Sequence, residues 1–255
     1  MVHFVGAGPG AADLITVRGA KLLSEADVII YAGSLVNQEL LQYAKKTCEI
    51  HNSATMTLED VLAVMETAER KGQTTVRLHT GEPSIYGAVR EQMDYLEKKG
   101  IAYDSCPGVS ACFGAAAAMN LEYTLPGVAQ SLIITRMEGR TAVPERERIE
   151  EMAKHRTSMA VYLSAGMLET LAKRLIDGGY PKETPAAIAY KVTWPEEKIF
   201  YCTLESLGET GQRHGIRNTA LVLVGEAVGK GAYERSKLYD PDFETGFRGA
   251  RKEET

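Results

Sequence analysis

Short apolar runs alternate with longer amphipathic segments along most of the chain. In the first half the runs occupy residues 1–5, 27–31, 74–79 and 101–106. Their length and their content of β-branched residues predict strands. The segments between them carry apolar residues at every third or fourth position, which predicts helices. This alternating order of strands and helices predicts a mostly parallel sheet covered by helices.

One of the expected helices has clear start and stop signals. Thr57 and Asp60 have the spacing of a capping box, with aspartate in place of the usual glutamate. Gly72 ends the segment. The apolar face between these signals comprises Leu58, Val61, Leu62, Met65 and Ala68. Further helices are expected to begin near Thr16 and to cover residues 86–99 and 109–119.

The second half of the chain repeats these patterns less regularly. Strands are predicted at residues 131–135, 159–163, 186–190, 198–203 and 219–224, and helices at 144–154 and 166–176. Residues 194–197 lie between two of these strands and predict a hairpin turn, so the second sheet should be mixed. The expected fold class is therefore α/β, with two α/β domains, the first mostly parallel and the second mixed.

The predicted domain boundary lies where Leu125-Pro126-Gly127 breaks the pattern. The expected domains are residues 1–125 and 126–231. Residues 232–255 form a charged tail that is expected to be mobile or loosely packed.

Composition narrows the class of protein. Apolar residues make up 44% of the 255 residues, and the formal net charge of −5 argues against a nucleic-acid partner. No apolar run approaches the ~18 residues that span a bilayer, and no basic segment typical of a signal peptide opens the chain. The four cysteines and five histidines lack metal-binding spacings. We therefore expect a cytoplasmic protein with no metal, no nucleic-acid partner and no membrane contact.

Two glycine-rich turns directly follow predicted strands. Residues 6–10 (Gly-Ala-Gly-Pro-Gly) follow the first strand, and residues 80–87 (Thr-Gly-Glu-Pro-Ser-Ile-Tyr-Gly) follow the third. Because glycine has no Cβ, such turns let a ligand approach the backbone. In a parallel sheet both turns lie at the carboxyl edge, so we expect one ligand-binding crevice there.

The spacing of Gly6, Gly8 and Ala11 also fits a dinucleotide-binding fingerprint. Three features disfavour a nicotinamide-dependent oxidoreductase. Pro9 has no N–H for a pyrophosphate, the next helix is expected well past the last glycine, and the strand at 27–31 ends without a carboxylate for a ribose. The turn therefore offers exposed backbone but no features that bind phosphate. This suits a ligand that contains a nucleoside but no phosphate, of which S-adenosylmethionine is the common example.

The order of motifs resembles that of the tetrapyrrole methylases. The motifs are residues 6–10, 13–16, 80–83 and 107–111. The resemblance extends over residues 2–228, and it implies two α/β domains, a homodimer, and S-adenosylmethionine bound in the cleft between the domains.

Three further segments are similar to the precorrin-4 C11-methyltransferases of cobalamin biosynthesis: residues 31–36, 135–145 and 190–199. This similarity implies methyl transfer to C11 of cobalt-precorrin-4 or of metal-free precorrin-4, with the cobalt form favoured on overall resemblance. The uroporphyrinogen-III, precorrin-2, diphthamide and ribosomal-RNA methyltransferases share the cofactor turns and remain alternatives, as does a cofactor-sensing regulator on the same fold.

The family pattern, carried over position by position, implies a cofactor site at the turns and strand ends. Its residues are Pro9, Gly81, Glu82, Ile85, Ser110, Ala111, Leu163, Val192 and Ala220. Two positions depart from the pattern. Glu82 stands where the family usually has aspartate, which moves the carboxylate one methylene outward, and Gly33 stands where aspartate is common.

The implied substrate is ringed with carboxylates, which arginine forks bind well. Arg136 and Arg140 lie just past the domain boundary and are the predicted substrate contacts, with Lys191 as a second choice. A sulfonium donor needs no acid for its leaving group, so no catalytic side chain is assigned. His79 is expected to be a packed histidine and Trp194 a packing residue.

Overall fold

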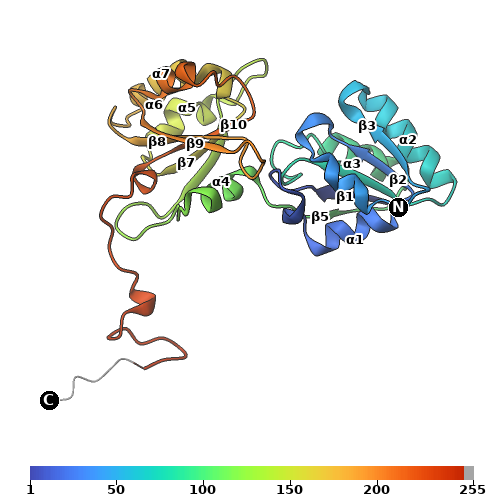
Figure 1. Ribbon diagram of the computed structural model, residues 1–255, viewed down its shortest axis with the longest axis horizontal. Coiled ribbons are helices and arrows are strands. Elements are labelled where there is room, and N and C mark those ends of the chain that lie inside the picture. Colours follow the sequence, from blue (N-terminus) through green and yellow to red (C-terminus); the bar gives the residue numbers. More distant parts are fainter. Residues whose placement is uncertain (250–255) are drawn as a thin grey trace. The chain divides into compact units, whose positions relative to one another are not determined.

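The structure, a computed structural model, describes residues 1–249 and forms two compact units, each built on one sheet (Figure 1). The first unit comprises Met1–Ala118 together with Lys191–Glu197, and the second comprises the other described residues. The limits expected from the sequence place the junction a few residues later, at residue 125. They also do not anticipate that Lys191–Glu197 joins the first unit.

The sheet of the first unit is parallel throughout, in the order β3-β2-β4-β1-β5. Its strands are β1 (Val2–Gly6), β2 (Val28–Tyr31), β3 (Glu49–Asn52), β4 (Thr75–His79) and β5 (Tyr103–Cys106). The prediction of a mostly parallel sheet is confirmed. The sequence pattern misses β3, because this strand lies at the edge of the sheet, is largely exposed and has no apolar run.

The α-helices of the first half are α1 (Val17–Glu25), α2 (Leu58–Arg70), α3 (Arg90–Lys98) and α4 (Ala111–Met119). A short 3-10 turn, η1 (Ala12–Leu14), precedes α1, and three more lie between α1 and α2 at η2 (Gly33–Leu35), η3 (Gln38–Tyr43) and η4 (Ser53–Thr55). The predicted capping box of α2 is confirmed. The Thr57 hydroxyl accepts the N–H of Asp60 at 3.2 Å, and the Asp60 carboxylate accepts the N–H of Thr57 at 2.9 Å.

The helix predicted at residues 86–99 begins later, at Arg90. Tyr86 has a φ of 57° and Ala88 a φ of 50°, a left-handed conformation that right-handed helices do not contain. The prediction of the helix start is therefore wrong, and the residues before α3 extend the second glycine-rich turn.

Helices cover both faces of the first sheet. Leu23 of α1 packs with Val5 on one face, whereas Met65 of α2 and Leu96 of α3 pack with Phe4 on the other. β1 and β4 are neighbours in the sheet, yet the helices that follow them, α1 and α3, lie on opposite faces. This is a topological switch point, where an open parallel sheet forms a crevice for ligands at its carboxyl edge.

The second unit contains the predicted mixed sheet, in the order β6-β7-β10-β8-β9. Its strands are β6 (Leu132–Arg136), β7 (Ser158–Tyr162), β8 (Pro185–Tyr190), β9 (Lys198–Thr203) and β10 (Ala220–Val224). β6 and β7 are parallel, and the other neighbours are antiparallel. The predicted hairpin is confirmed, since β8 and β9 pair along their whole length.

The helices of the second unit are α5 (Ile149–Ala153), α6 (Leu168–Asp177) and α7 (Leu207–Arg213), with short turns at η5 (Glu145–Glu147), η6 (Ala165–Met167) and η7 (Glu226–Gly229). The continuous helix predicted at 144–154 is wrong. Arg148 has an extended backbone (ψ 147°) and separates η5 from α5. Ile149 and Ala153 are fully buried, so the helix forms only where it can pack.

The described part of the predicted tail is largely exposed and carries the short turn η8 (Lys237–Tyr239). The Arg248 guanidinium donates to three backbone carbonyls of the same segment, at distances between 2.5 and 3.3 Å. Mobility of the tail stays a prediction, and its residues 250–255 lie outside the described residues. Within residues 1–249, none of the helices combines the length and apolar character needed to cross a membrane.

Candidate functional site

The two glycine-rich turns meet at the carboxyl edge of the first sheet. The N–H of Gly81 donates to the carbonyl of Gly8 at 2.9 Å, and the N–H of Gly8 donates back at 3.3 Å. The N–H of Ala7 donates to the carbonyl of His79 at 2.7 Å, so the pairing of β1 with β4 continues into the turns. The turns that were expected to border one crevice therefore adjoin each other at the switch point.

A third turn, residues 107–110 after β5, packs against the same place. A Cβ built at Gly108 would lie 2.2 Å from the carbonyl oxygen of Gly81 and 2.7 Å from the Cα of Gly6. A Cβ at Gly6 would lie 2.6 Å from the Cα of Gly108. These distances are too short for non-bonded atoms, so Gly6 and Gly108 are required by the close packing of three backbone segments.

Gly81 differs from these two glycines. Its φ of +62° favours glycine, and the nearest atoms to a Cβ there, the backbone nitrogen of Ala111 and the Cα of Ser110, would be 3.8 Å away. The space beside Gly81 therefore admits a Cβ, in ordinary van der Waals contact with the backbone of residues 109–111. Three predicted cofactor residues, Gly81, Ser110 and Ala111, lie together around it.

Glu82, another predicted cofactor contact, is already engaged by the protein. One carboxylate oxygen accepts the N–H of Ser84 at 2.9 Å and the other accepts the N–H of Gly108 at 2.8 Å. Desolvation by burial favours a higher pKa, but these two backbone donors, together with a side-chain hydrogen bond from Ser84, hold the pKa of Glu82 below its usual value. The carboxylate ties the second turn to the third, and a ribose contact stays a prediction.

Residues 191–197 pack on the first turn. A Cβ at Gly10 would lie 2.4 Å from the indole Cδ1 of Trp194 and 2.8 Å from the hydroxyl oxygen of Thr193. Trp194 therefore packs against the glycine turn, as predicted. Val192 belongs to the same unit as Pro9 and Gly81.

In the second unit, Leu163 and Ala220 lie at one edge of the mixed sheet. β7 ends at Tyr162, and its antiparallel neighbour β10 begins at Ala220. Leu163 has a φ of 53°, and 68% of its surface is exposed. A strained, exposed residue at a strand end is a feature of functional sites. The other predicted cofactor residues, including Ile85, belong to the first unit.

The two predicted substrate arginines follow the same edge, because Arg136 ends β6 beside Tyr162 of β7. The two guanidinium groups differ in whether other residues of the protein already bind them. The Arg136 guanidinium donates to the carbonyls of Thr141 at 3.1 Å and Ala142 at 2.7 Å. Arg140 is exposed and forms no ion pair with any residue in the described part of the chain. Of these two arginines, Arg140 is therefore the one whose guanidinium is not engaged by another described residue.

Sequence reasoning missed Arg174 of α6. Its guanidinium forms an ion pair with Glu138 at 2.6 Å and a second, two-pronged pair with Glu150 of α5. Side-chain hydrogen bonds from Arg174 are the main cause that lowers the pKa of both carboxylates. The three residues come from three different elements, so no local spacing in the sequence indicates the cluster.

His79, at the end of β4, is buried, with 5% of its surface exposed. Desolvation by burial, and secondarily the charge of Arg77, lower the pKa of His79 to about 3. The ring is therefore neutral near pH 7, and it stacks on Phe4 with 6.3 Å between ring centroids. This agrees with the prediction of a packed histidine.

We expect His79 to make the fold less stable in acid. The pKa of His79 is about 3 in the folded protein, whereas it is about 6.5 in the unfolded chain. Below pH 6.5 the unfolded chain therefore binds a proton that the folded protein does not, and the free energy of unfolding decreases as the pH falls toward 3. The loss between pH 7.5 and pH 5.5 should be about 1 kcal/mol. Urea unfolding of the wild type and of His79→Gln at both pH values measures it. The free energy of unfolding of the variant should lack this pH-dependent loss. Equal pH dependence in the two proteins would contradict the lowered pKa of His79.

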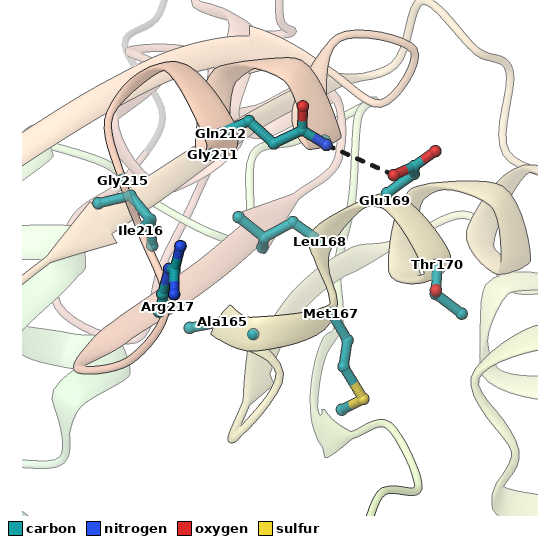
Figure 2. Close-up of a pocket in the computed structure, with 12 residues that line it drawn as sticks. Ala165, Met167, Leu168, Glu169, Thr170, Gly211, Gln212, Gly215, Ile216 and Arg217 are labelled. Atoms are coloured by element: carbon teal, nitrogen blue, oxygen red, sulfur yellow. Dashed lines mark hydrogen bonds between the residues drawn. The ribbon is translucent and has the colours of Figure 1, made fainter.

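A cavity of about 390 Å³ lies in the second unit between the start of α6 and α7 (Figure 2). The amide nitrogen of Gln212 donates to the Glu169 carboxylate at 3.5 Å on its rim, and Arg217 also lines it. No residue predicted to bind cofactor or substrate is among its lining residues. The candidate site is therefore located by the strand-end turns and not by this cavity.

Comparison with known proteins gives a consistent result. The family described as tetrapyrrole (corrin/porphyrin) methylases matches residues 1–208. A relative from Methanocaldococcus jannaschii, named cobalt-precorrin-4 C(11)-methyltransferase, is 51% identical over 251 residues, which cover 98% of this chain and 97% of the relative.

Solved structures agree with the sequence relatives. The X-ray structure of the cobalt precorrin-4 methyltransferase CbiF matches with a TM-score of 0.87 and 43% identity, over 89% of this chain and 95% of that one. The uroporphyrin-III C-methyltransferase of Thermus thermophilus, in complex with S-adenosylhomocysteine, matches with a TM-score of 0.74 and 26% identity, over 89% of this chain and 92% of that one.

Proposed function

The chain belongs to the tetrapyrrole methylase family, and from this premise we propose that it transfers a methyl group from S-adenosylmethionine to C11 of cobalt-precorrin-4 in cobalamin biosynthesis. The observation that carries the proposal is the identity of 51%, over nearly the whole of both chains, to a relative named for this reaction. The uroporphyrin-III enzyme is much less similar, at 26% identity, which disfavours that substrate.

The residues at the carboxyl edge of the first sheet fit the proposed donor. The space beside Gly81 is one that a Cβ would fill, and it is bordered by the backbone of residues 109–111. Backbone N–H and C=O groups suit an adenine and a sulfonium, and neither demands a phosphate site. We propose that Pro9, Gly81, Ile85, Ser110, Ala111 and Val192 of the first unit hold the donor, whereas donor contacts by Leu163 and Ala220 stay predictions from the sequence. Glu82 takes part by fixing the turn.

In the proposed mechanism the protein holds its two ligands in position and exchanges no protons with them. S-adenosylmethionine, when bound, supplies an already activated methyl group whose thioether leaves without an acid. The strand-end turns fix the donor side, and Arg140 holds a carboxylate of the acceptor. Good orientation in a dry site can contribute roughly 7–11 kcal/mol. His79 is neutral and buried, so it acts as a packing residue beneath the turn.

The proposed substrate contact is Arg140, because its guanidinium is exposed and unpaired among the described residues. A direct substrate contact by Arg136, also predicted from the sequence, remains a prediction, as do the homodimer and the cytoplasmic location. Charge-assisted contacts between a guanidinium and a carboxylate are strong and directional.

Anaerobic incubation with methyl-labelled S-adenosylmethionine and either cobalt-precorrin-4 or metal-free precorrin-4 tests the function. We expect label at C11, assigned by NMR of the product, with the cobalt form used faster. If metal-free precorrin-4 is used faster, the metal-free form becomes the proposed substrate. Binding of the donor without transfer to either acceptor would instead indicate a sensor, and binding of NADH in place of the donor would indicate an oxidoreductase.

A further inference from the structure

The loop that follows β6, residues 137–142, is fixed at its base. The N–H of Met137 donates to the hydroxyl of Ser164 at 3.1 Å, and this hydroxyl donates to the carbonyl of Tyr162 at 2.8 Å. Ser164 is completely buried. The first residue of the loop is therefore held against the end of β7.

Arg136 closes the same loop from inside. Its Nη1 donates to the carbonyl of Thr141 at 3.1 Å and to that of Met137 at 3.4 Å, and its Nη2 donates to the carbonyl of Ala142 at 2.7 Å. The planar fork thus joins both ends of the loop, a geometry that the single ammonium of lysine cannot reproduce. Across the narrow turn the N–H of Gly139 donates to the carbonyl of Thr141 at 3.3 Å.

A third attachment holds the middle of the loop. Glu138 pairs with Arg174 of α6 at 2.6 Å, and Arg174 is itself held by Glu150 of α5. This pairing fixes the side chain of Glu138, although one guanidinium shared by two carboxylates leaves the cluster with a net charge of −1. Arg140, two residues further on, is exposed and has no ion-pair partner in the part of the chain that the structure describes.

We propose that Arg136 is a positioning residue that does not touch the tetrapyrrole, and that it holds residues 137–142 in the shape that presents Arg140 to a substrate carboxylate. The inference rests on the proposed function and assigns different roles to the two arginines. The guanidinium of Arg136 donates to carbonyls of its own loop, whereas that of Arg140 is available to bind a substrate carboxylate.

A double-mutant cycle separates the two roles, because a residue that acts only through another adds little once the other is removed. Arg140→Ala should raise the KM for cobalt-precorrin-4 about ten- to a hundredfold, with the KM for S-adenosylmethionine unchanged. Arg136→Ala should cause a similar loss alone, but less than about a threefold further loss in the Arg140→Ala background. Losses that multiply in the double variant would mean that Arg136 contacts the substrate itself, and would overturn the proposal.

Arg136→Lys provides a second test that keeps the charge. It should behave like Arg136→Ala, because the loop needs the fork and not the charge. Rescue of the substrate KM to within about threefold of the wild type would indicate a direct charge contact and overturn the proposal.

Hydrogen–deuterium exchange of residues 137–142 tests the loop without any substrate. Both Arg136 variants should exchange faster there than the wild type, at least about tenfold at the amide of Gly139, while Arg140→Ala should exchange at the wild-type rate. Unchanged exchange in the Arg136 variants would overturn the proposal even if methyl transfer behaves as expected. A wild type that methylates neither precorrin would refute the proposed function, and the exchange experiment would still decide the role of Arg136 in the loop.

Discussion

Gly81→Val should weaken binding of S-adenosylmethionine by at least about a hundredfold, equivalent to about 2.7 kcal/mol of binding free energy. A Cβ at Gly81 would fit in the space beside it, with backbone atoms of Ser110 and Ala111 3.8 Å away. A valine side chain would fill this space and keep a ligand from the backbone. Isothermal titration calorimetry of the purified variant measures the effect.

The variant also needs a control for backbone strain, because the φ of Gly81 is +62°. Gly100 has nearly the same φ, +66°, and no atom within 4 Å of a Cβ built there. Gly100→Val should therefore lose similar stability from a β-branched residue at positive φ but bind the donor with wild-type affinity. Normal binding by Gly81→Val, or equal loss in both variants, would mean that the turn is not the binding site.

Gly108→Ala should lower the free energy of unfolding by about 3 kcal/mol or more, the upper range for overpacking. The added Cβ would lie 2.2 Å from the carbonyl oxygen of Gly81 and 2.7 Å from the Cα of Gly6. Both neighbours are backbone atoms at strand ends, so no rotation of a side chain can relieve the contact. Urea unfolding followed by circular dichroism measures the loss.

Gly231→Ala is the matched control for this prediction. No atom lies within 4 Å of a Cβ built at Gly231, so its stability should stay within about 0.5 kcal/mol of the wild type. A Gly108→Ala protein as stable as this control would show that the three turns are not packed as closely as the structure has them.

Much of the fold could be predicted from local patterns. β4 and the turn that contains Gly81 form one continuous stretch in which an apolar strand passes into glycine. The cap at Thr57 depends only on a residue three positions away, and it forms as predicted. β3 escaped prediction because an exposed edge strand needs no apolar run. The start of α3 was misplaced because left-handed residues such as Tyr86 leave no mark in apolar periodicity.

The sequence by itself determined where the buried strands end in glycine turns, since hydrophobic burial and the missing Cβ of glycine act within a few neighbouring residues. Only the tertiary structure decided what each turn meets. It packed Gly108 onto the backbone of Gly6, engaged Glu82 with the N–H of Gly108, and folded Arg136 onto its own loop. It also joined residues 191–197 to the first unit. Each of these contacts forms because folding brings together atoms from distant segments, or because a loop folds back onto the side chain that precedes it. A local pattern of residues does not predict such contacts.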